Sequence, residues 1–171
     1  MMHLYLDAKE AGAQLTTIDI QYNTNVAKSD WYVPVYPATD GALVFGILSE
    51  VIAQGWQDSE FLRAHTEAPF LVKEDNTFLR MSDLGVPATE GPVNAMTGKP
   101  TVIDPEVVWD EATRSAKPYS EAEMPALEGI PEEIEGFRIR PVWSMILEAI
   151  SAWTPERASE TCGVPVEDIK R

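Results

Sequence analysis

Two short segments carry the residue types best suited to hold a nucleotide. Asp19 follows the β-branched and apolar residues 15–18, and Asp40 follows Ala38 and Thr39 at the start of a long apolar run. A carboxylate at a strand end can accept hydrogen bonds from ribose hydroxyls. The two oxygens of Asp40 match the parallel N1–H and amine donors of a guanine. The chemistry that these residues indicate is binding, not bond making.

Both segments also have a structural interpretation. Asp is a common turn residue, which is sufficient to explain Asp19. Thr39 is a credible helix N-cap, and Asp40 suits the positive end of a helix dipole. From the residues alone, binding and capping stay open, and capping is the commoner arrangement.

The chain lacks the arrangements that catalysis or metal binding would need. No Gly-rich phosphate loop and no Ser–His–Asp elbow occurs. Cys162 is the single cysteine, and His3 and His65 lie far apart without ligand spacing. We therefore expect no catalytic residue and no metal ligand in this chain.

Charge and hydropathy exclude two classes of partner. The chain has 28 Asp and Glu against 13 Lys and Arg, a net charge of −15, which repels a phosphate backbone. No apolar run reaches the ~20 residues that cross a bilayer. We expect no nucleic-acid partner and no transmembrane segment.

Apolar periodicity predicts the elements that position these segments. Ranges 15–20 and 31–36 have strand character, with a polar loop between them. Helices are expected at 3–11, 40–54 and 58–66, and a hairpin pairs 70–72 with 77–79. Residues 81–136 are Pro-rich, so we expect extended chain and turns there, with strand fragments at 101–103 and 107–109.

The C-terminal region, 137–171, is expected to be helical. Thr154 is a cap, Pro155 takes the first helical position, and Gly163 ends that helix. The whole pattern predicts an α/β fold in one domain, 1–171. We expect a three-layer-type nucleotide-binding domain with a short, mostly parallel sheet, a long irregular segment at 81–136 and C-terminal helices.

The run from Leu15 to Leu43 resembles the dimethyl sulfoxide reductase family of molybdopterin oxidoreductases. Asp19, Asp30 and Asp40 fall at the family's spacing without a gap, and Pro37 and Thr39 fall on matching positions. The resemblance continues through 50–70, 108–110, 126–129, 153–156 and 161–169 in family order.

The resemblance implies a cofactor site. In this family the two loops hold one guanosine end of a bis(molybdopterin guanine dinucleotide) that carries molybdenum or tungsten. By position, the implied binding residues are Ile18, Asp19, Ile20, Gln21, Tyr22, Ala38, Thr39 and Asp40. Ile20 and Gln21 replace the family's Pro-Arg, and Ala38 replaces its Gly, so a cation is absent and a methyl group is added.

The resemblance therefore predicts an internal domain of a molybdenum or tungsten oxidoreductase. The family's metal ligand, iron–sulfur cysteines and C-terminal cofactor domain are absent here. We expect the isolated chain to be inactive and to retain no cofactor. Its expected partners are the remaining domains of the enzyme and an iron–sulfur electron-transfer subunit. A twin-arginine signal for the periplasm would lie upstream.

Two other functions compete with this one. A stand-alone, non-catalytic binding or scaffold module would keep the fold without the cofactor and would be indifferent to guanine nucleotides. A small hydrolase is the third candidate, and the lack of a nucleophile–base arrangement argues against it.

Overall fold

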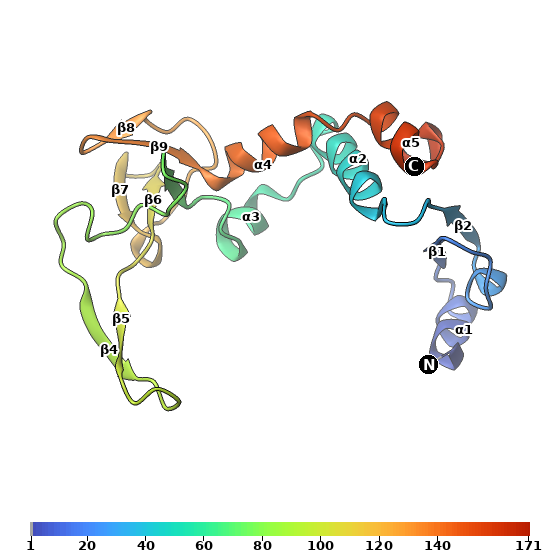
Figure 1. Cartoon of the computed structure of the whole chain (residues 1–171), viewed down its shortest axis with the longest axis horizontal. Helices are drawn as coiled ribbons and strands as arrows, with labels where there is room; N and C mark the ends of the chain where they lie inside the picture. The colour runs from blue at the N-terminus through green and yellow to red at the C-terminus, as the bar shows by residue number, and fades with distance from the viewer. Residues whose placement is uncertain (1) are drawn as a thin grey trace. The chain divides into compact units, whose positions relative to one another are not determined.

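The computed structural model describes residues 2–171, and these fold as two compact units (Figure 1). The first unit comprises residues up to Gln57 together with Ala149–Arg171, and the second comprises Asp58–Glu148. The sequence led us to expect one domain. The difference arises because the middle of the chain builds its own core.

The first unit contains helices from both ends of the chain and two short strands. Its elements are α1 (Met2–Glu10), β1 (Thr16–Asp19), η1 (Val26–Lys28), β2 (Trp31–Pro34), α2 (Asp40–Ala53), α5 (Pro155–Cys162) and α6 (Val166–Ile169). Helix α4 (Val142–Ser151) contributes residues to both units. These bounds agree with the predicted elements to within a few residues.

Strands β1 and β2 form a parallel pair, with Thr16 opposite Trp31 and Asp19 opposite Pro34. The expected parallel sheet is thus confirmed as one short pair. The remaining sheets among residues 2–171 are antiparallel, so "mostly parallel" is wrong for the chain as a whole. Parallel neighbours need a crossover, and the 11-residue segment between Asp19 and Trp31 provides it here.

Helix α2 packs against α5 and α6 to form the core of the first unit. The buried residues of this core are Val33, Val35, Ala42, Leu43, Ala158, Cys162, Val164 and Ile169. Gly46 allows the close approach, because a Cβ there would lie 2.5 Å from the Cβ of Ala158. The opposite face of α2 is apolar too, but Val44, Ile47 and Leu48 on it are exposed.

The ends of α5 follow the local sequence signals. The Thr154 hydroxyl accepts a hydrogen bond from the Arg157 N–H, and Pro155 stands at the first helical position. Gly163 ends the helix with φ 77°, in the left-handed region. The predicted cap and stop are both confirmed.

The second unit is built from short antiparallel strands and α3 (Ser59–His65). Its strands are β3 (Leu71–Lys73), β4 (Thr89–Val93), β5 (Pro100–Ile103), β6 (Val107–Asp110), β7 (Ser115–Pro118), β8 (Glu133–Ile134) and β9 (Phe137–Pro141), with η2 (Tyr119–Glu121). The predicted hairpin is confirmed, since Val72 pairs with Phe78 and the Leu79 N–H donates to the Leu71 carbonyl. Buried Leu71, Leu79, Val107 and Ile139 form the core.

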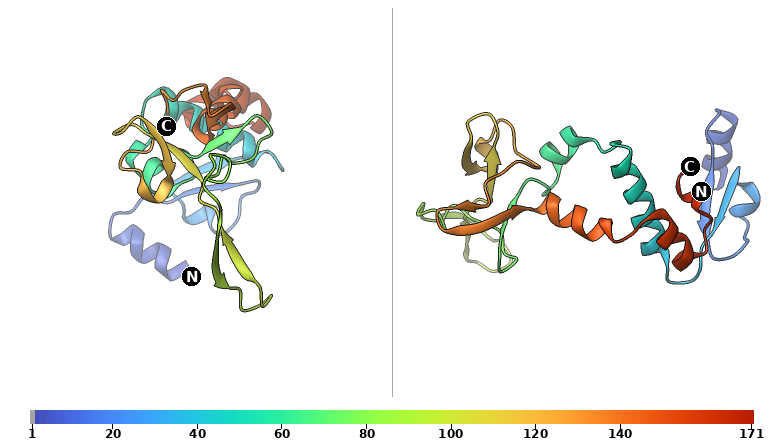
Figure 2. Two further views of the ribbon diagram at one scale, coloured as in Figure 1. Left: turned by 90° about the vertical axis from the view of Figure 1, so that its left-hand side faces the viewer. Right: turned by 90° about the horizontal axis from the view of Figure 1, so that it is seen from above.

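The segment 81–136 contains more regular structure than its composition suggests. The expected strand fragments at 101–103 and 107–109 lie in β5 and β6, and β4, β7 and β8 lie there as well. The β4–β5 hairpin extends away from the rest of the second unit (Figures 1 and 2). Long-range antiparallel pairing stabilises strands that are too short and Pro-rich to be seen locally.

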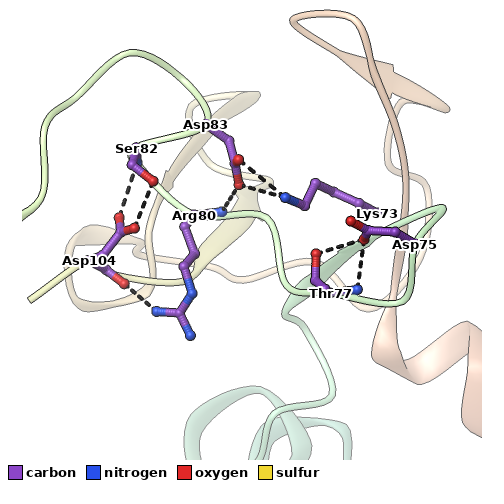
Figure 3. A network of polar contacts seen from close by, with 7 residues as sticks. All are labelled: Lys73, Asp75, Thr77, Arg80, Ser82, Asp83 and Asp104. Atoms are coloured by element: carbon purple, nitrogen blue, oxygen red, sulfur yellow. Dashed lines mark hydrogen bonds and ion pairs between the residues drawn. The ribbon is translucent and has the colours of Figure 1, made fainter. Parts of the chain in front are cut away.

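Polar side chains hold the turns of the second unit in place. Asp110 is fully buried and accepts hydrogen bonds from the Lys117 ammonium at 2.9 Å and the Met124 N–H at 2.9 Å. Near the base of the β4–β5 hairpin, Lys73 pairs with Asp83, and Ser82 donates to the Asp104 carboxylate (Figure 3). These contacts are structural, because each carboxylate is satisfied by neighbouring donors.

None of the helices formed by residues 2–171 combines the length and apolar character needed to cross a membrane.

Candidate nucleotide-binding site

The two predicted binding loops leave the same edge of the β1–β2 pair. Asp19 ends β1 opposite Pro34, which ends β2. The Val35 N–H then donates to the Asp19 carbonyl at 3.3 Å. Residues 20–22 and 35–39 therefore start from adjacent points, as expected for a ligand site beyond parallel strand ends.

The Asp19 carboxylate organises the first loop. One oxygen accepts the Gln21 N–H at 3.3 Å, and the other accepts the Asn23 side-chain amide at 2.6 Å. The Tyr32 hydroxyl donates to the Asp19 carbonyl at 3.2 Å. Asp19 is thus a turn former in this structure, with lone pairs left over, since each carboxylate oxygen can accept two hydrogen bonds.

The first loop presents an apolar surface around this carboxylate. Ile18 and Ile20 are about half exposed, and Tyr22 is 71% exposed. The ring of Tyr22 meets that of Tyr32 edge-on, with centroids 5.9 Å apart. Gln21 is exposed and contributes no charge where the family has a cation.

Asp30, the middle acid of the family spacing, has a structural task. Its carboxylate accepts the Leu15 N–H at 2.8 Å and pairs with the Lys9 ammonium at 2.9 Å. These contacts, with the backbone hydrogen bond from Leu15 as the largest, hold the pKa of Asp30 below its ordinary value. Asp30 joins the starts of β1 and β2 and the end of α1, far from the loops.

The predicted capping role of Thr39 is wrong. Its hydroxyl donates to the Tyr36 carbonyl at 2.7 Å and makes no side-chain cap to α2. The preceding residue, Ala38, has φ 62°, a conformation that Gly adopts at lower cost. The tight loop turns the Thr39 hydroxyl backwards, so the first N–H groups of α2 lack a side-chain acceptor.

Asp40 is the first residue of α2, and its side chain is exposed. Its carboxylate makes no hydrogen bond or ion pair with any residue in the part of the chain that the structure describes. A carboxylate at a helix N-terminus is favoured by the dipole, and this one is open to a ligand with paired N–H donors.

The sequence did not reveal the contacts beneath the second loop. The Tyr36 ring lies against Gly163, and the Tyr36 N–H donates to the Cys162 carbonyl at 2.9 Å. These partners come from the end of α5, at the opposite end of the chain. A Gly at a predicted helix stop was the only local signal, and it did not indicate which loop would pack there.

The remaining hollows of the surface lie outside these loops. A cavity of about 360 Å³ in the first unit is lined by Tyr5, Asn25 and residues 15–18, so it shares only Ile18 with the candidate site. A larger one of about 690 Å³ lies in the second unit, between α3 and residues 119–125. Within residues 2–171, no three His, Cys, Asp or Glu side chains are grouped to hold a metal ion.

The site residues fit a nucleoside better than a phosphate chain. They offer a free carboxylate, a turn carboxylate and exposed aromatic and aliphatic surface, but no cationic side chain. Phosphate oxygens would have to be met by backbone N–H groups, such as those at the start of α2.

Comparison with known proteins places the chain among molybdopterin enzymes, although no family model matches it. It is 29% identical over 95% of its length to the alpha chain of chlorate reductase from Ideonella dechloratans. It is 29% identical over 96% of its length to a protein of Halobacterium salinarum that is named for the catalytic function of dimethyl sulfoxide reductase. It is 26% identical over 98% to the alpha chain of perchlorate reductase from Dechloromonas aromatica.

The matched region covers 18% of the first two relatives and 21% of the third, so the chain spans about a fifth of their length. The family resemblance read from the sequence is thereby confirmed. The chain belongs to the dimethyl sulfoxide reductase family of molybdopterin oxidoreductases and corresponds to a portion of their catalytic subunits.

Proposed function

We propose that this chain supplies part of the pocket for one guanosine end of a molybdopterin guanine dinucleotide, within a molybdenum or tungsten oxidoreductase. The observation that carries the proposal is the unpaired Asp40 carboxylate, which stands at a helix start beside the carboxyl end of β1. The bound cofactor supplies the redox chemistry. This chain supplies binding and orientation.

In this proposal each loop has a separate task. Asp40 accepts the N1–H and exocyclic amine of the guanine, a pairing that a carboxylate makes with two parallel bonds. The spare lone pairs of Asp19 accept ribose hydroxyls, while Ile18, Ile20 and Tyr22 exclude water from the first loop. Gln21 and Thr39 contribute polar backbone at the edges, and Ala38 shapes the turn.

We further propose that the β1–β2 pair and α2 are one part of a three-layer nucleotide-binding domain that other polypeptide completes. Helix α2 has a second apolar face, on which Val44, Ile47 and Leu48 are exposed. The β4–β5 hairpin also exposes Val93 and Met96. Exposed apolar surface of this kind is typical of protein interfaces.

The partners follow from the same reasoning. Two of the relatives are named as alpha chains of their enzymes, which implies that they work with other polypeptides. We propose that the remaining domains of the catalytic polypeptide cover α2, and that a further partner is an iron–sulfur electron-transfer protein. The substrate would then be set by residues outside this chain.

Nucleotide titration of the isolated chain tests the proposal. Amide chemical shifts of residues 18–22 and 36–43 are followed by NMR on addition of GMP, IMP and AMP. We expect GMP to bind best, because IMP lacks the exocyclic amine and AMP lacks both donors. Asp40→Asn should weaken GMP about tenfold or more, as expected for a charge-assisted pair worth roughly 1.5–3 kcal/mol.

Asp7→Asn is the matched control, because Asp7 is an exposed carboxylate of α1 in the same unit and carries the same charge. It should leave GMP binding unchanged. If the wild-type chain shifts equally with all three nucleotides, or if the two Asn variants behave alike, Asp40 does not read guanine. A well-folded chain indifferent to every nucleotide would favour the stand-alone scaffold instead.

A further inference from the structure

Tyr36 lies flat on a glycine at the end of α5. A Cβ at Gly163 would meet three atoms of the Tyr36 ring at 2.5–2.8 Å, and Gly163 has φ 77°. Only glycine satisfies both the backbone conformation and the space. Yet 59% of Tyr36 is exposed. One part of the ring therefore rests on the backbone while much of it remains open to solvent.

The backbone of Tyr36 is held on both sides. Its N–H donates to the Cys162 carbonyl at 2.9 Å. Its carbonyl accepts the Thr39 hydroxyl at 2.7 Å and the Thr39 N–H at 3.3 Å. The loop is thereby closed between Tyr36 and Thr39, and Asp40 follows immediately as the start of α2. The seat of Tyr36 on α5 sets where the Asp40 carboxylate stands.

We propose that Tyr36 is a stacking platform for the nucleotide base, held in place by the C-terminal end of α5. The inference rests on the proposed function and adds the residue that binds the flat surface of the base. An aromatic face and a carboxylate four residues apart suit a purine that carries N–H donors on its edge. Stacking supplies affinity for any base, and Asp40 supplies the preference for guanine.

The two roles separate in a titration of the chain with GMP, IMP and AMP. Tyr36→Ala should weaken all three by a similar factor, about tenfold, and should leave the ratio of GMP to IMP affinity unchanged. Tyr36→Phe should restore wild-type affinity, because the ring is kept. Asp40→Asn should instead remove the GMP preference. Unchanged affinity in Tyr36→Ala, or no rescue by Tyr36→Phe, overturns the stacking role.

The positioning role is tested without nucleotide. Gly163→Ala forces a methyl group into the Tyr36 ring, and amide hydrogen exchange should speed up across residues 36–43. Gly55→Ala is the matched control, since Gly55 has φ 68° at the end of α2 and nothing lies within 4 Å of its absent Cβ. It has the same kind of backbone strain without touching the loop.

The outcomes distinguish the two levels of the argument. If the wild-type chain prefers no guanine nucleotide, the proposed function fails and the stacking role fails with it. The exchange experiment still decides the positioning role: faster exchange at 36–43 in Gly163→Ala but not in Gly55→Ala supports it. Equal exchange in the two variants shows that α5 does not hold the loop and overturns it.

Discussion

The contact between Gly46 and Ala158 should control the stability of the first unit. Gly46 lies in α2 where the helix meets α5, and Ala158 is fully buried. A Cβ built on Gly46 lies 2.5 Å from the Ala158 Cβ, whereas ordinary contact begins at 3.4 Å, so the helices must separate by about 0.9 Å. Both carbon atoms are fixed to backbone, so no rotamer change can relieve the clash.

Two opposing effects determine the size of the change in Gly46→Ala. Overpacking a core costs about 1–3 kcal/mol. Replacing Gly by Ala inside a helix gains about 1 kcal/mol. Gly41→Ala in the same helix isolates the gain, because nothing lies within 4 Å of its absent Cβ. We expect Gly46→Ala to be about 1–3 kcal/mol less stable than Gly41→Ala.

Urea unfolding followed by fluorescence of Trp31 and Trp153, which pack against the core of the first unit, measures this difference. Adding Ala158→Gly to Gly46→Ala restores the space, so the double variant should be more stable than the sum of the two single changes predicts. If Gly46→Ala unfolds at the same urea concentration as Gly41→Ala, the close helix contact is not a feature of the protein in solution.

Two further predictions follow from single residues. Ala38→Gly should stabilise the chain by up to about 1 kcal/mol, because relief of ~1–2 kcal/mol of left-handed strain is partly offset by the greater freedom of Gly in the unfolded chain, and urea unfolding checks this. Asp110→Asn should destabilise the second unit by leaving the Lys117 ammonium without its carboxylate. The Lys117 hydrogen bond is the largest of the contacts that hold the pKa of Asp110 well below its ordinary value of 3.8. Its stabilisation is therefore complete above about pH 4 and falls as the pH drops further. Wild type should lose stability in that acid range, and a variant with the same acid sensitivity as wild type would contradict this role of Asp110.

Local sequence signals predicted the elements of the first unit well. The Thr154 cap, Pro155 and Gly163 act through hydrogen bonds and backbone preferences within one turn, so they are visible without tertiary contacts. The same holds for the hairpin at 70–79. The signal at Thr39 was of the same local type but misleading, because a loop closed through Tyr36 competes for the same hydroxyl.

Non-local pairing limited the prediction of the second unit. Strands β4 and β7 have no strong alternation of their own, and β4 includes Pro92. They form because β5 and β6 supply partners across a turn. Pairing energy of this kind depends on which segments meet, and composition alone predicted a mostly irregular chain.

The sequence by itself determined the family of this protein, the two strand ends and the position of Asp40, because these depend on residue order and on spacing along the chain. Only the tertiary structure decided that Asp40 is unpaired, that Asp19 is tied into its own turn and that Tyr36 rests on Gly163. These facts depend on which side chains meet when distant segments pack. The ends of the chain meet in the first unit, and no local pattern encodes that contact.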